Sequence, residues 1–170
     1  MTLQEVVSSL IGYPVEESDK DLTDAEISAL YDWVDGTLTR GHDLEDKSLL
    51  STLDNALSKC PNYRGIVYRA DYLDSYRNIK VGSVISILGG STKSTEVADR
   101  WIRIRSIVGP SVQFVLSITK GADISKYNPS QQEVVLLSGS KFRLTHIESI
   151  EVQLKRRLAN SVRVHAVQVN

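Results

Sequence analysis

The chain has 170 residues, of which 41% are hydrophobic and 24% are charged, and this suits one domain with one core. Its 20 lysines and arginines are matched by 21 aspartates and glutamates, so the net charge of −1 excludes a global field that would attract nucleic acid or acidic membranes. The single cysteine, Cys60, excludes an intrachain disulfide framework, and three scattered histidines with one cysteine lack zinc-ligand spacing. We expect a monomeric single domain without a metal ion.

The N-terminal residues show no basic segment followed by an apolar one, and the chain has no apolar run long enough to span a bilayer. We therefore expect neither a secretion signal nor a membrane-spanning helix. These features predict a protein that is cytoplasmic in the cell where it is made. Delivery elsewhere by a separate machine would leave no mark of this kind in the sequence.

The first third of the chain is predicted to be helical. Apolar residues at helical spacing predict a short helix over residues 3–11. A capping box formed by Thr23 and Glu26 begins a second helix, whose apolar stripe continues until Gly41. A third helix carries leucines on one face over residues 50–57. We expect residues 1–60 to form a helical subdomain.

From about residue 62 the apolar pattern changes to the period of strands, and residues 61–170 are expected to form a β-rich core. The expected strands cover residues 65–69, 81–88, 112–118, 134–137, 142–152 and 162–164, and one helix covers residues 95–105. The glycines and hydroxyl residues at 89–92 are typical of a turn. Trp33 and Trp101 fall among helical residues, where core or edge packing is expected. Helices followed by a mostly antiparallel sheet indicate an α+β domain.

The stretch from residue 127 to residue 137 brings a carboxylate to the start of a buried strand. Asn128 and Pro129 favour a turn, and the apolar run that follows Glu133 is typical of a buried strand. Burying an ionised carboxylate is costly, so Glu133 is either used there or left in water. Because side chains alternate along a strand, Gln131 and Glu133 are expected to point the same way and Gln132 the other.

Three short motifs follow one another at the ends of predicted strands. Tyr68-Arg69 ends the first strand, Ser91-Thr92-Lys93 follows the second, and Gln131-Gln132-Glu133 opens a later one. In this order and spacing the chain resembles the arginine, serine, glutamate class of ADP-ribosyltransferases over roughly residues 21–170. The compact layout is most similar to the small transferases of tailed phages and related bacterial toxins.

The resemblance implies a fold and a reaction. The fold would be α+β, with N-terminal helices packed on a mixed, mostly antiparallel two-sheet core. The chain would act in the cytoplasm of the producing or infected bacterial cell, as a mono-ADP-ribosyltransferase with NAD as substrate and a macromolecular acceptor as partner. Glu133 would be catalytic, because its hydrogen bond to the ribose 2′-hydroxyl favours the oxocarbenium-like cation that forms when nicotinamide leaves.

The same resemblance assigns the NAD-binding residues. Arg69 would bind the phosphates and ribose of NAD, since a guanidinium matches phosphate oxygens well. Arg64, in Tyr-Arg-Gly, is a rival for this role. Ala70 stands where the family has glycine. In that position its backbone would bind the nicotinamide amide. Ser91 would hold Glu133 and the nicotinamide ribose in place.

Three further positions bear on the motifs and the acceptor. Thr92 continues the serine motif, whose usual last serine is Lys93 here, and with Ser91 it would bind NAD. Gln131 would act with Glu133 as a catalytic and acceptor-binding residue. It stands where transferases that modify arginine usually have glutamate, and because an amide carries no charge we expect an acceptor other than arginine. Tyr127 in the preceding loop either contacts the acceptor or anchors the loop.

Two alternatives to a protein-modifying enzyme stay open at this point. The first is ADP-ribosylation of an RNA or DNA base, for which the run at residues 155–157, with Lys141, Arg143 and Arg163, offers a basic patch. Such a run is more often a solvated hairpin end. The second is a module that binds NAD or a partner with little catalysis, which Ala70 and Lys93 keep open.

Overall fold

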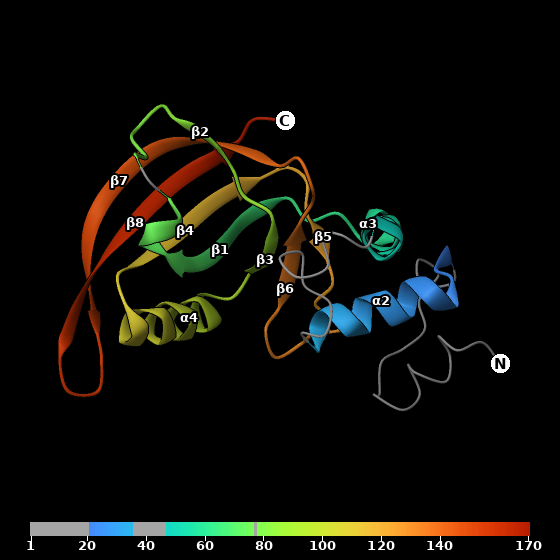
Figure 1. Cartoon of the computed structure of the whole chain (residues 1–170), viewed down its shortest axis with the longest axis horizontal. Helices are drawn as coiled ribbons and strands as arrows, with labels where there is room; N and C mark the ends of the chain where they lie inside the picture. Colours follow the sequence, from blue (N-terminus) through green and yellow to red (C-terminus); the bar gives the residue numbers. More distant parts are fainter. Residues whose placement is uncertain (1–20, 36–46, 77) are drawn as a thin grey trace.

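The computed structural model describes residues 21–35, 47–76 and 78–170, and it has the expected α+β class (Figure 1). The helices are α2 (Asp24–Val34), α3 (Lys47–Lys59), the 3₁₀ turn η2 (Leu73–Ser75) and α4 (Thr95–Val108). The strands are β1 (Gly65–Tyr72), β2 (Val84–Ser86), β3 (Gly89–Thr92), β4 (Ser111–Ile118), β5 (Ala122–Asp123), β6 (Glu133–Leu136), β7 (Lys141–Gln153) and β8 (Leu158–Gln168). The helix predicted over residues 3–11, and any extension of α2 toward Gly41, lie outside the described residues.

The strands form one sheet in the order β2-β7-β8-β4-β1-β3-β6-β5. Only the β4–β8 pair is parallel, so the sheet is mixed and mostly antiparallel, as expected. β1 and β3 are joined through a single residue pair, Tyr68 and Thr92. The two sheets implied by the resemblance are therefore two arms of one continuous sheet, β2-β7-β8-β4-β1 and β3-β6-β5.

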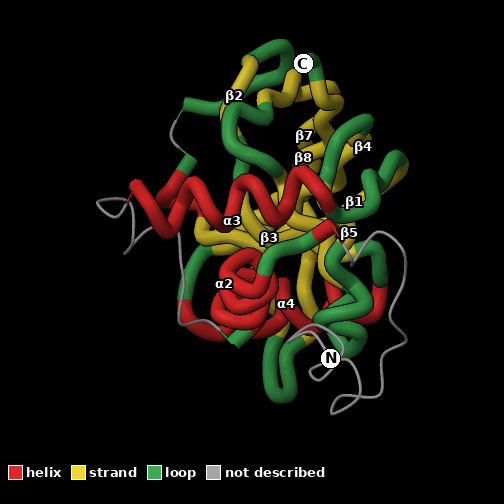
Figure 2. Tube along the Cα trace, turned by 90° about the vertical axis from the view of Figure 1, so that its right-hand side faces the viewer, coloured by secondary structure: helices red, strands yellow, loops and turns green. Residues whose placement is uncertain are grey.

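The two N-terminal helices pack at the end of the sheet that carries β5 and β6. Thr23 Oγ1 accepts a hydrogen bond from the Glu26 amide at 3.1 Å, and the Thr23 amide donates to Glu26 Oε1 at 3.3 Å, which confirms the predicted capping box. Lys59 Nζ of α3 donates to the same Glu26 oxygen at 2.8 Å. Figure 2 shows α2 and α3 crossing beside the β3-β6-β5 arm, and this arm packs against these two helices.

Two apolar clusters lie on opposite sides of β1 and β4. Alternate residues of β4, including Phe114 and Leu116, are buried in the larger cluster with Phe142 of β7, as the strand pattern predicted. On the other face, Ile102 of α4 packs against Ala70 of β1 and the end of the β7–β8 hairpin. Among the described residues, no helix has the length and apolar character needed to cross a membrane.

The segment over residues 89–92 is a strand and not the turn that its composition suggested. β3 pairs antiparallel with β6, with Gly90 opposite Val135 and Thr92 opposite Glu133. Glycines carry no alternating pattern, so the pairing with a buried strand, which lies 40 residues away in sequence, left no local signal. The strand predicted over residues 81–88 is correspondingly shorter and reduces to β2.

Gly121, just before β5, is expected to tolerate no side chain. A Cβ there would lie 2.7 Å from Val134 Cγ1 and 2.8 Å from Ile118 Cδ1, both of which belong to buried side chains. Overpacking of this kind costs about 1–3 kcal/mol, so Gly121→Ala should lower the free energy of unfolding by that amount in urea titrations. Gly109→Ala is the matched control, because nothing lies within 4 Å of its Cβ position. Equal losses in both variants would contradict the packing argument.

Candidate active site

A cleft opens where β1 and β3 separate after their single pair. The cavity has a volume of about 380 Å³ and lies between these strands, α4 and the loop that precedes β6. Its lining residues are Arg69, Ala70, Asp71, Gly90, Trp101, Ile104, Arg105, Asn128, Gln131 and Glu133. Four of the residues singled out from the sequence, at positions 69, 70, 131 and 133, therefore meet in one cleft.

Glu133, the first residue of β6, is a buried carboxylate with two fixed donors. Its side chain is held by the Trp33 indole, whose Nε1 donates to Oε2 at 2.7 Å, and by Asn128, whose Nδ2 donates to Oε1 at 2.9 Å. Burial raises the pKa of Glu133 above its ordinary value, and the two hydrogen bonds oppose part of that rise. The residue is only 8% exposed, so its charge acts in a medium of low dielectric constant.

Gly90 makes the room for this carboxylate. A Cβ at Gly90 would lie 3.0 Å from Glu133 Oε2, and one at Gly89 would lie 3.1 Å from Arg69 Nη1. The backbone of β3 thus approaches both charged side chains more closely than a strand with larger residues would allow. The two glycines are part of the site, and their contribution had no signal in the sequence beyond a possible turn.

Trp33 is the main site residue that sequence reasoning missed. Its placement on α2 predicted packing, and the ring does border the core, but its N–H reaches a carboxylate 100 positions further along the chain. The available signal was general: the indole N–H of a buried tryptophan needs an acceptor. Only the docking of α2 against the β3–β6 arm identifies that acceptor as Glu133.

Arg69 is anchored through two of its nitrogens. Nε donates to Asp71 Oδ2 at 2.7 Å, and Nη1 donates to the carbonyl oxygen of Gly90 at 2.9 Å. Burial by itself would lower the pKa of Arg69, but the charge and hydrogen bond of Asp71, together with Tyr76, outweigh burial and raise the pKa, so the guanidinium stays charged. Tyr76 donates its hydroxyl to the same Asp71 oxygen at 2.6 Å.

The rival arginine lies elsewhere. Arg64 precedes β1, is exposed, and does not line the cleft, whereas Arg69 does. Between the two candidates the geometry therefore favours Arg69. Ala70 borders the cleft, and its methyl group belongs to the cluster with Ile102 beneath α4, so the carbon that replaces the family's glycine is accommodated by α4.

The hydroxyls of the serine motif fasten β3 to both sides of Glu133. Ser91 is fully buried, and its Oγ donates to the carbonyl oxygen of Val134 at 2.7 Å. Thr92 Oγ1 donates to the carbonyl oxygen of Gln131 at 2.6 Å. Neither residue lines the cleft. Their contacts in this structure are with the backbone that carries Glu133, and direct contacts of Ser91 and Thr92 with NAD stay predictions.

Lys93, which replaces the usual last serine, points away from the cleft. Its Nζ donates to Asp123 Oδ2 at 2.9 Å and to Ser125 Oγ at 3.2 Å, and its backbone amide donates to the carbonyl oxygen of Gln132 at 3.1 Å. The ion pair with Asp123 is partly buried. This departure from the family pattern therefore fastens the loop between β5 and β6 and leaves the cleft lining unchanged.

Gln131 is held in a defined orientation at the mouth of the site. Trp101 Nε1 of α4 donates to Gln131 Oε1 at 2.9 Å, which leaves the amide NH₂ group as the donor end. Gln131 and Glu133 line the same cleft while Gln132 lines a different hollow, as expected. Gln131 is nevertheless part of a turn and not of the strand, and Gln132 in this turn has a φ of 49°.

Tyr127 does not contact the cleft, so its assignment as an acceptor-binding residue is corrected. It is 7% exposed and its ring meets that of Tyr31 edge-on, with 5.5 Å between centroids. The surrounding cluster joins α2, α3 and the β5–β6 arm. Burial of a large ring against two helices makes Tyr127 the anchor of this loop, which was the alternative interpretation.

Comparison with known proteins identifies the fold. No family model matches the chain. The Vis toxin from Vibrio splendidus, an ADP-ribosyltransferase, superimposes with a TM-score of 0.65 at 22% identity, over 99% of this chain and 83% of the toxin. The chain has the ADP-ribosyltransferase fold. Two further structures share this fold. The component C2-I of the C2-toxin from Clostridium botulinum has a TM-score of 0.63 at 16% identity, over 99% of this chain and 47% of that one. The effector XopAI from Xanthomonas axonopodis pv. citri has a TM-score of 0.62 at 16% identity, over 98% of this chain and 75% of that one.

One curated relative is similar in sequence. A Mycobacterium avium (strain 104) protein, provisionally named NAD(+)–arginine ADP-ribosyltransferase Mav, is 31% identical over a match of 107 residues that covers 59% of this chain. The chain spans only 12% of that protein. The resemblance noted from the three motifs is thus confirmed for the fold. Within the ADP-ribosyltransferase fold of this chain, the motifs lie on β1, β3 and the start of β6, which are neighbours in the sheet.

Proposed function

We propose that this chain is an NAD-dependent mono-ADP-ribosyltransferase. The observation that carries the proposal is the buried Glu133 carboxylate, oriented by two donors in the same cleft as the anchored guanidinium of Arg69. In the reaction the glycosidic bond between ribose and nicotinamide breaks, nicotinamide leaves with the bonding electrons, and a nucleophilic atom of the acceptor bonds to the same ribose carbon and loses its proton.

The residues of the cleft fit NAD. The Arg69 guanidinium supplies a positive charge and N–H donors for a phosphate or ribose hydroxyl. β1 pairs with β3 only at Tyr68, so at Ala70 the β3 side of the strand borders the cleft, while β4 pairs with Ala70 on the other side through Gln113. This open side is suited to an amide such as that of nicotinamide. Within the described residues, no group of three or more histidine, cysteine, aspartate or glutamate side chains is placed to hold a metal ion.

The role of Glu133 follows from charge. Loss of neutral nicotinamide from its positively charged linkage leaves an oxocarbenium-like ribose, and a carboxylate that accepts a hydrogen bond from the 2′-hydroxyl stabilises that cation. A preorganised charge in a buried site needs no rearrangement when the cation forms, and contacts of this type contribute a factor of about 10² to 10³ in rate. Trp33 and Asn128 provide this preorganisation here.

The cleft favours an acceptor other than arginine. Its two carboxylates are engaged, Asp71 by Arg69 and Tyr76 and Glu133 by its own donors, and Gln131 brings an amide where arginine-modifying enzymes carry a charge. Arg105 lines the same cleft and would repel an incoming guanidinium. The name of the M. avium relative includes arginine, and the Vis toxin has a structure in complex with agmatine.

Labelled NAD added to a bacterial lysate tests both the proposed transferase activity and the proposed class of acceptor. Wild type and Glu133→Ala are compared, protein and nucleic acid are separated, and the adducts are mapped by mass spectrometry. We expect label only with wild type, in protein, on residues other than arginine. Adducts restricted to arginine would contradict the acceptor assignment, and label in RNA or DNA would support the nucleic-acid alternative. No release of nicotinamide by folded wild type would leave only an NAD-binding module.

A further inference from the structure

The C-terminal part of α4 and the tip of the β7–β8 hairpin concentrate positive charge in a chain that is close to neutral. Residues 100–110 and 152–159 contain no aspartate or glutamate, and Asp99 and Glu151 only flank them. The two segments contain six cationic side chains: Arg100, Arg103, Arg105, Lys155, Arg156 and Arg157. Among the ion pairs between described residues, none involves any of these six. Their charge is therefore not neutralised within the described part of the molecule.

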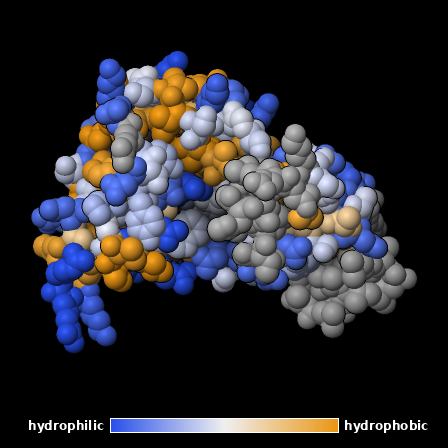
Figure 3. Space-filling view, viewed as in Figure 1, coloured by the Kyte–Doolittle hydropathy of each residue, from blue (hydrophilic) through white to orange (hydrophobic). Residues whose placement is uncertain are grey.

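The same surface exposes several aliphatic side chains. Ile104, Ile107 and Val108 of α4 are 53%, 65% and 71% exposed, and Leu158 of the hairpin is 55% exposed. Figure 3 shows an apolar patch beside long hydrophilic side chains at the end of the molecule where α4 and the hairpin lie. Exposed apolar groups gathered in this way, with a polar rim, are typical of a protein-binding surface.

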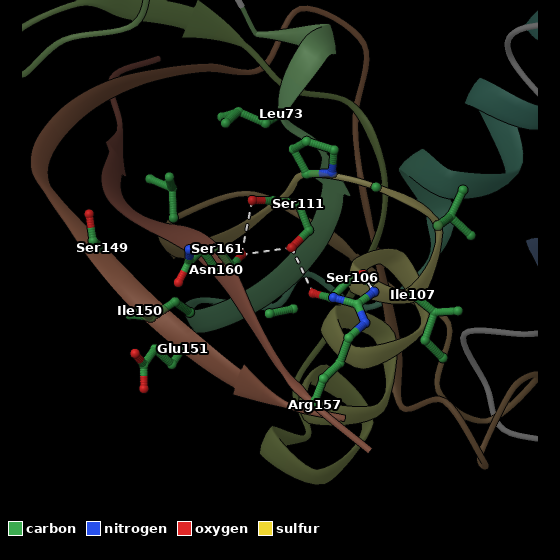
Figure 4. A pocket seen from close by; sticks show the side chains of 15 residues that line it. Leu73, Ser106, Ile107, Ser111, Ser149, Ile150, Glu151, Arg157, Asn160 and Ser161 are labelled. Atoms are coloured by element: carbon green, nitrogen blue, oxygen red, sulfur yellow. Dashed lines mark hydrogen bonds between the residues drawn. The ribbon is translucent and has the colours of Figure 1, made fainter. Parts of the chain in front are cut away.

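The two segments form one surface because they are joined. Arg157 Nη2 donates to the carbonyl oxygen of Ser106 at 3.4 Å, which holds the hairpin tip against the last turns of α4. A groove of about 930 Å³ lies along this junction, with Ile107 and Arg157 on the same side in the close-up of Figure 4. Beneath it, Val152 of β7 and Leu154, just after this strand, share a buried cluster with Ile102 of α4.

This surface continues into the NAD cleft. Ile104 and Arg105 line the cleft, and Ile107 and Val108, one turn further along the same helix, line the groove. The Arg105 guanidinium also lies over the ring of Tyr72, 5.2 Å from its centroid, at the boundary between the two. A molecule bound along α4 would therefore reach the site where the ribose is attacked.

We propose that α4 and the tip of the β7–β8 hairpin dock the acceptor, and that the acceptor is a protein presenting acidic residues around an exposed apolar side chain. This inference rests on the proposed transferase function and adds the class of substrate. The cations match an acidic surface, and the aliphatic side chains match an apolar anchor. A nucleic acid would use the cations alone, and the exposed apolar side chains of this surface are aliphatic, without the rings on which bases stack. Residues that complete the surface are Arg100, Arg103, Ile107, Val108, Lys155, Arg156, Arg157 and Leu158.

Paired variants test the docking surface without touching the cleft. In the docking variant Arg103→Glu is combined with Arg156→Glu, and Ile107→Ser is made separately. The control combines Lys141→Glu with Arg143→Glu, two exposed cations near the other end of β7, beside β2. Two activities are measured for each protein: nicotinamide release into water, which needs no acceptor, and transfer of label to lysate proteins at several salt concentrations.

We expect nicotinamide release to stay unchanged in all variants and transfer to fall about tenfold or more in both docking variants only, with a weaker salt dependence in the charge variant. Unchanged transfer in the docking variants, or an equal loss in the control, would overturn the inference. A wild type that releases no nicotinamide would instead overturn the transferase function on which it rests. The two failures are thus distinguishable.

Competition then decides the class of partner. A synthetic glutamate–leucine copolymer should inhibit transfer by wild type, without slowing nicotinamide release, and should inhibit the charge variant much less. Single-stranded DNA at equal total charge is the comparison. Inhibition by DNA that equals or exceeds that of the copolymer would overturn an acidic protein as the partner, because DNA carries the charge without aliphatic side chains.

Discussion

Glu133→Gln is expected to lower nicotinamide release and ADP-ribose transfer by about a hundredfold or more, with little change in the affinity for NAD. The substitution keeps the size and shape of the side chain, removes its charge, and turns one of its two acceptor oxygens into an NH₂ donor, which faces the Asn128 amide if the remaining oxygen keeps the Trp33 hydrogen bond. Since the charge acts on a cation that exists in the transition state and not in bound NAD, the loss falls on kcat. Initial rates of nicotinamide release, with NAD binding measured by calorimetry, check this expectation.

The matched control is Glu148→Gln. Glu148 lies on β7 among His146, Arg163 and His165, away from the cleft, and its replacement should leave the rate of nicotinamide release unchanged. If Glu133→Gln retained more than about a tenth of the wild-type rate, the loss would be too small for a residue that stabilises the developing cation. Glu133 would then be a binding residue, and the proposed mechanism would be wrong.

The same substitution should stabilise the fold at neutral pH. Burial raises the pKa of Glu133, so the ionised form is less favourable in the folded state than in the unfolded one. Above the folded-state pKa this lowers the free energy of unfolding of wild type, and below the ordinary glutamate pKa the penalty disappears because the group is protonated in both states. Urea titrations should therefore show Glu133→Gln more stable than wild type at neutral pH only. A stable but inactive variant is the usual sign of a strained functional residue.

The elements that were predicted well are those with local patterns. The capping box at Thr23, the alternation in β4 and the apolar run after Glu133 each depend on neighbours in sequence, and the structure contains all three. The motif residues Arg69 and Glu133 were found because each adjoins an apolar run of this kind, although β1 continues to Tyr72 and Arg69 lies inside the strand and not at its predicted end. Their meeting in one cleft follows from the order β1-β3-β6 in the sheet, which the periodicity of the sequence does not give.

The residues that sequence reasoning missed depend on tertiary docking. Helical spacing indicated which face of α2 is apolar, but not that Trp33 would donate a hydrogen bond to Glu133. Turn propensity placed Asn128 in a loop, but did not identify Glu133 as the acceptor of its hydrogen bond. Tyr127 was assigned either to the acceptor, by resemblance, or to anchoring its loop, and only the two helices that bury it decide for the anchor. Lys93 was interpreted as a departure that weakens the serine motif. Its role in the fold could not be predicted, because its partner Asp123 lies on a strand, β5, that the sequence pattern did not indicate.

Trp33→Phe is expected to lower nicotinamide release by about tenfold or more, although the ring that borders the core is kept. Phenylalanine has no N–H, so Glu133 Oε2 loses a hydrogen bond of 2.7 Å. A hydrogen bond to a charged group contributes about 1.5–3 kcal/mol, and about 1.4 kcal/mol corresponds to a factor of ten in rate. The carboxylate also becomes freer to turn from the direction in which the ribose hydroxyl approaches, so the loss should fall on kcat.

The pH profile separates this positioning role from simple packing. The Trp33 N–H favours ionised Glu133 and lowers its pKa, whereas burial raises it, so removing the N–H should raise that pKa further. Because the ionised form is the active one, activity is lost as pH falls through this pKa, and the acidic limb of Trp33→Phe should lie at higher pH than that of wild type. Trp101→Phe is the matched control: its N–H serves Gln131, so acceptor transfer should change while the acidic limb stays in place. Coincident acidic limbs for Trp33→Phe and wild type would show that the indole only packs.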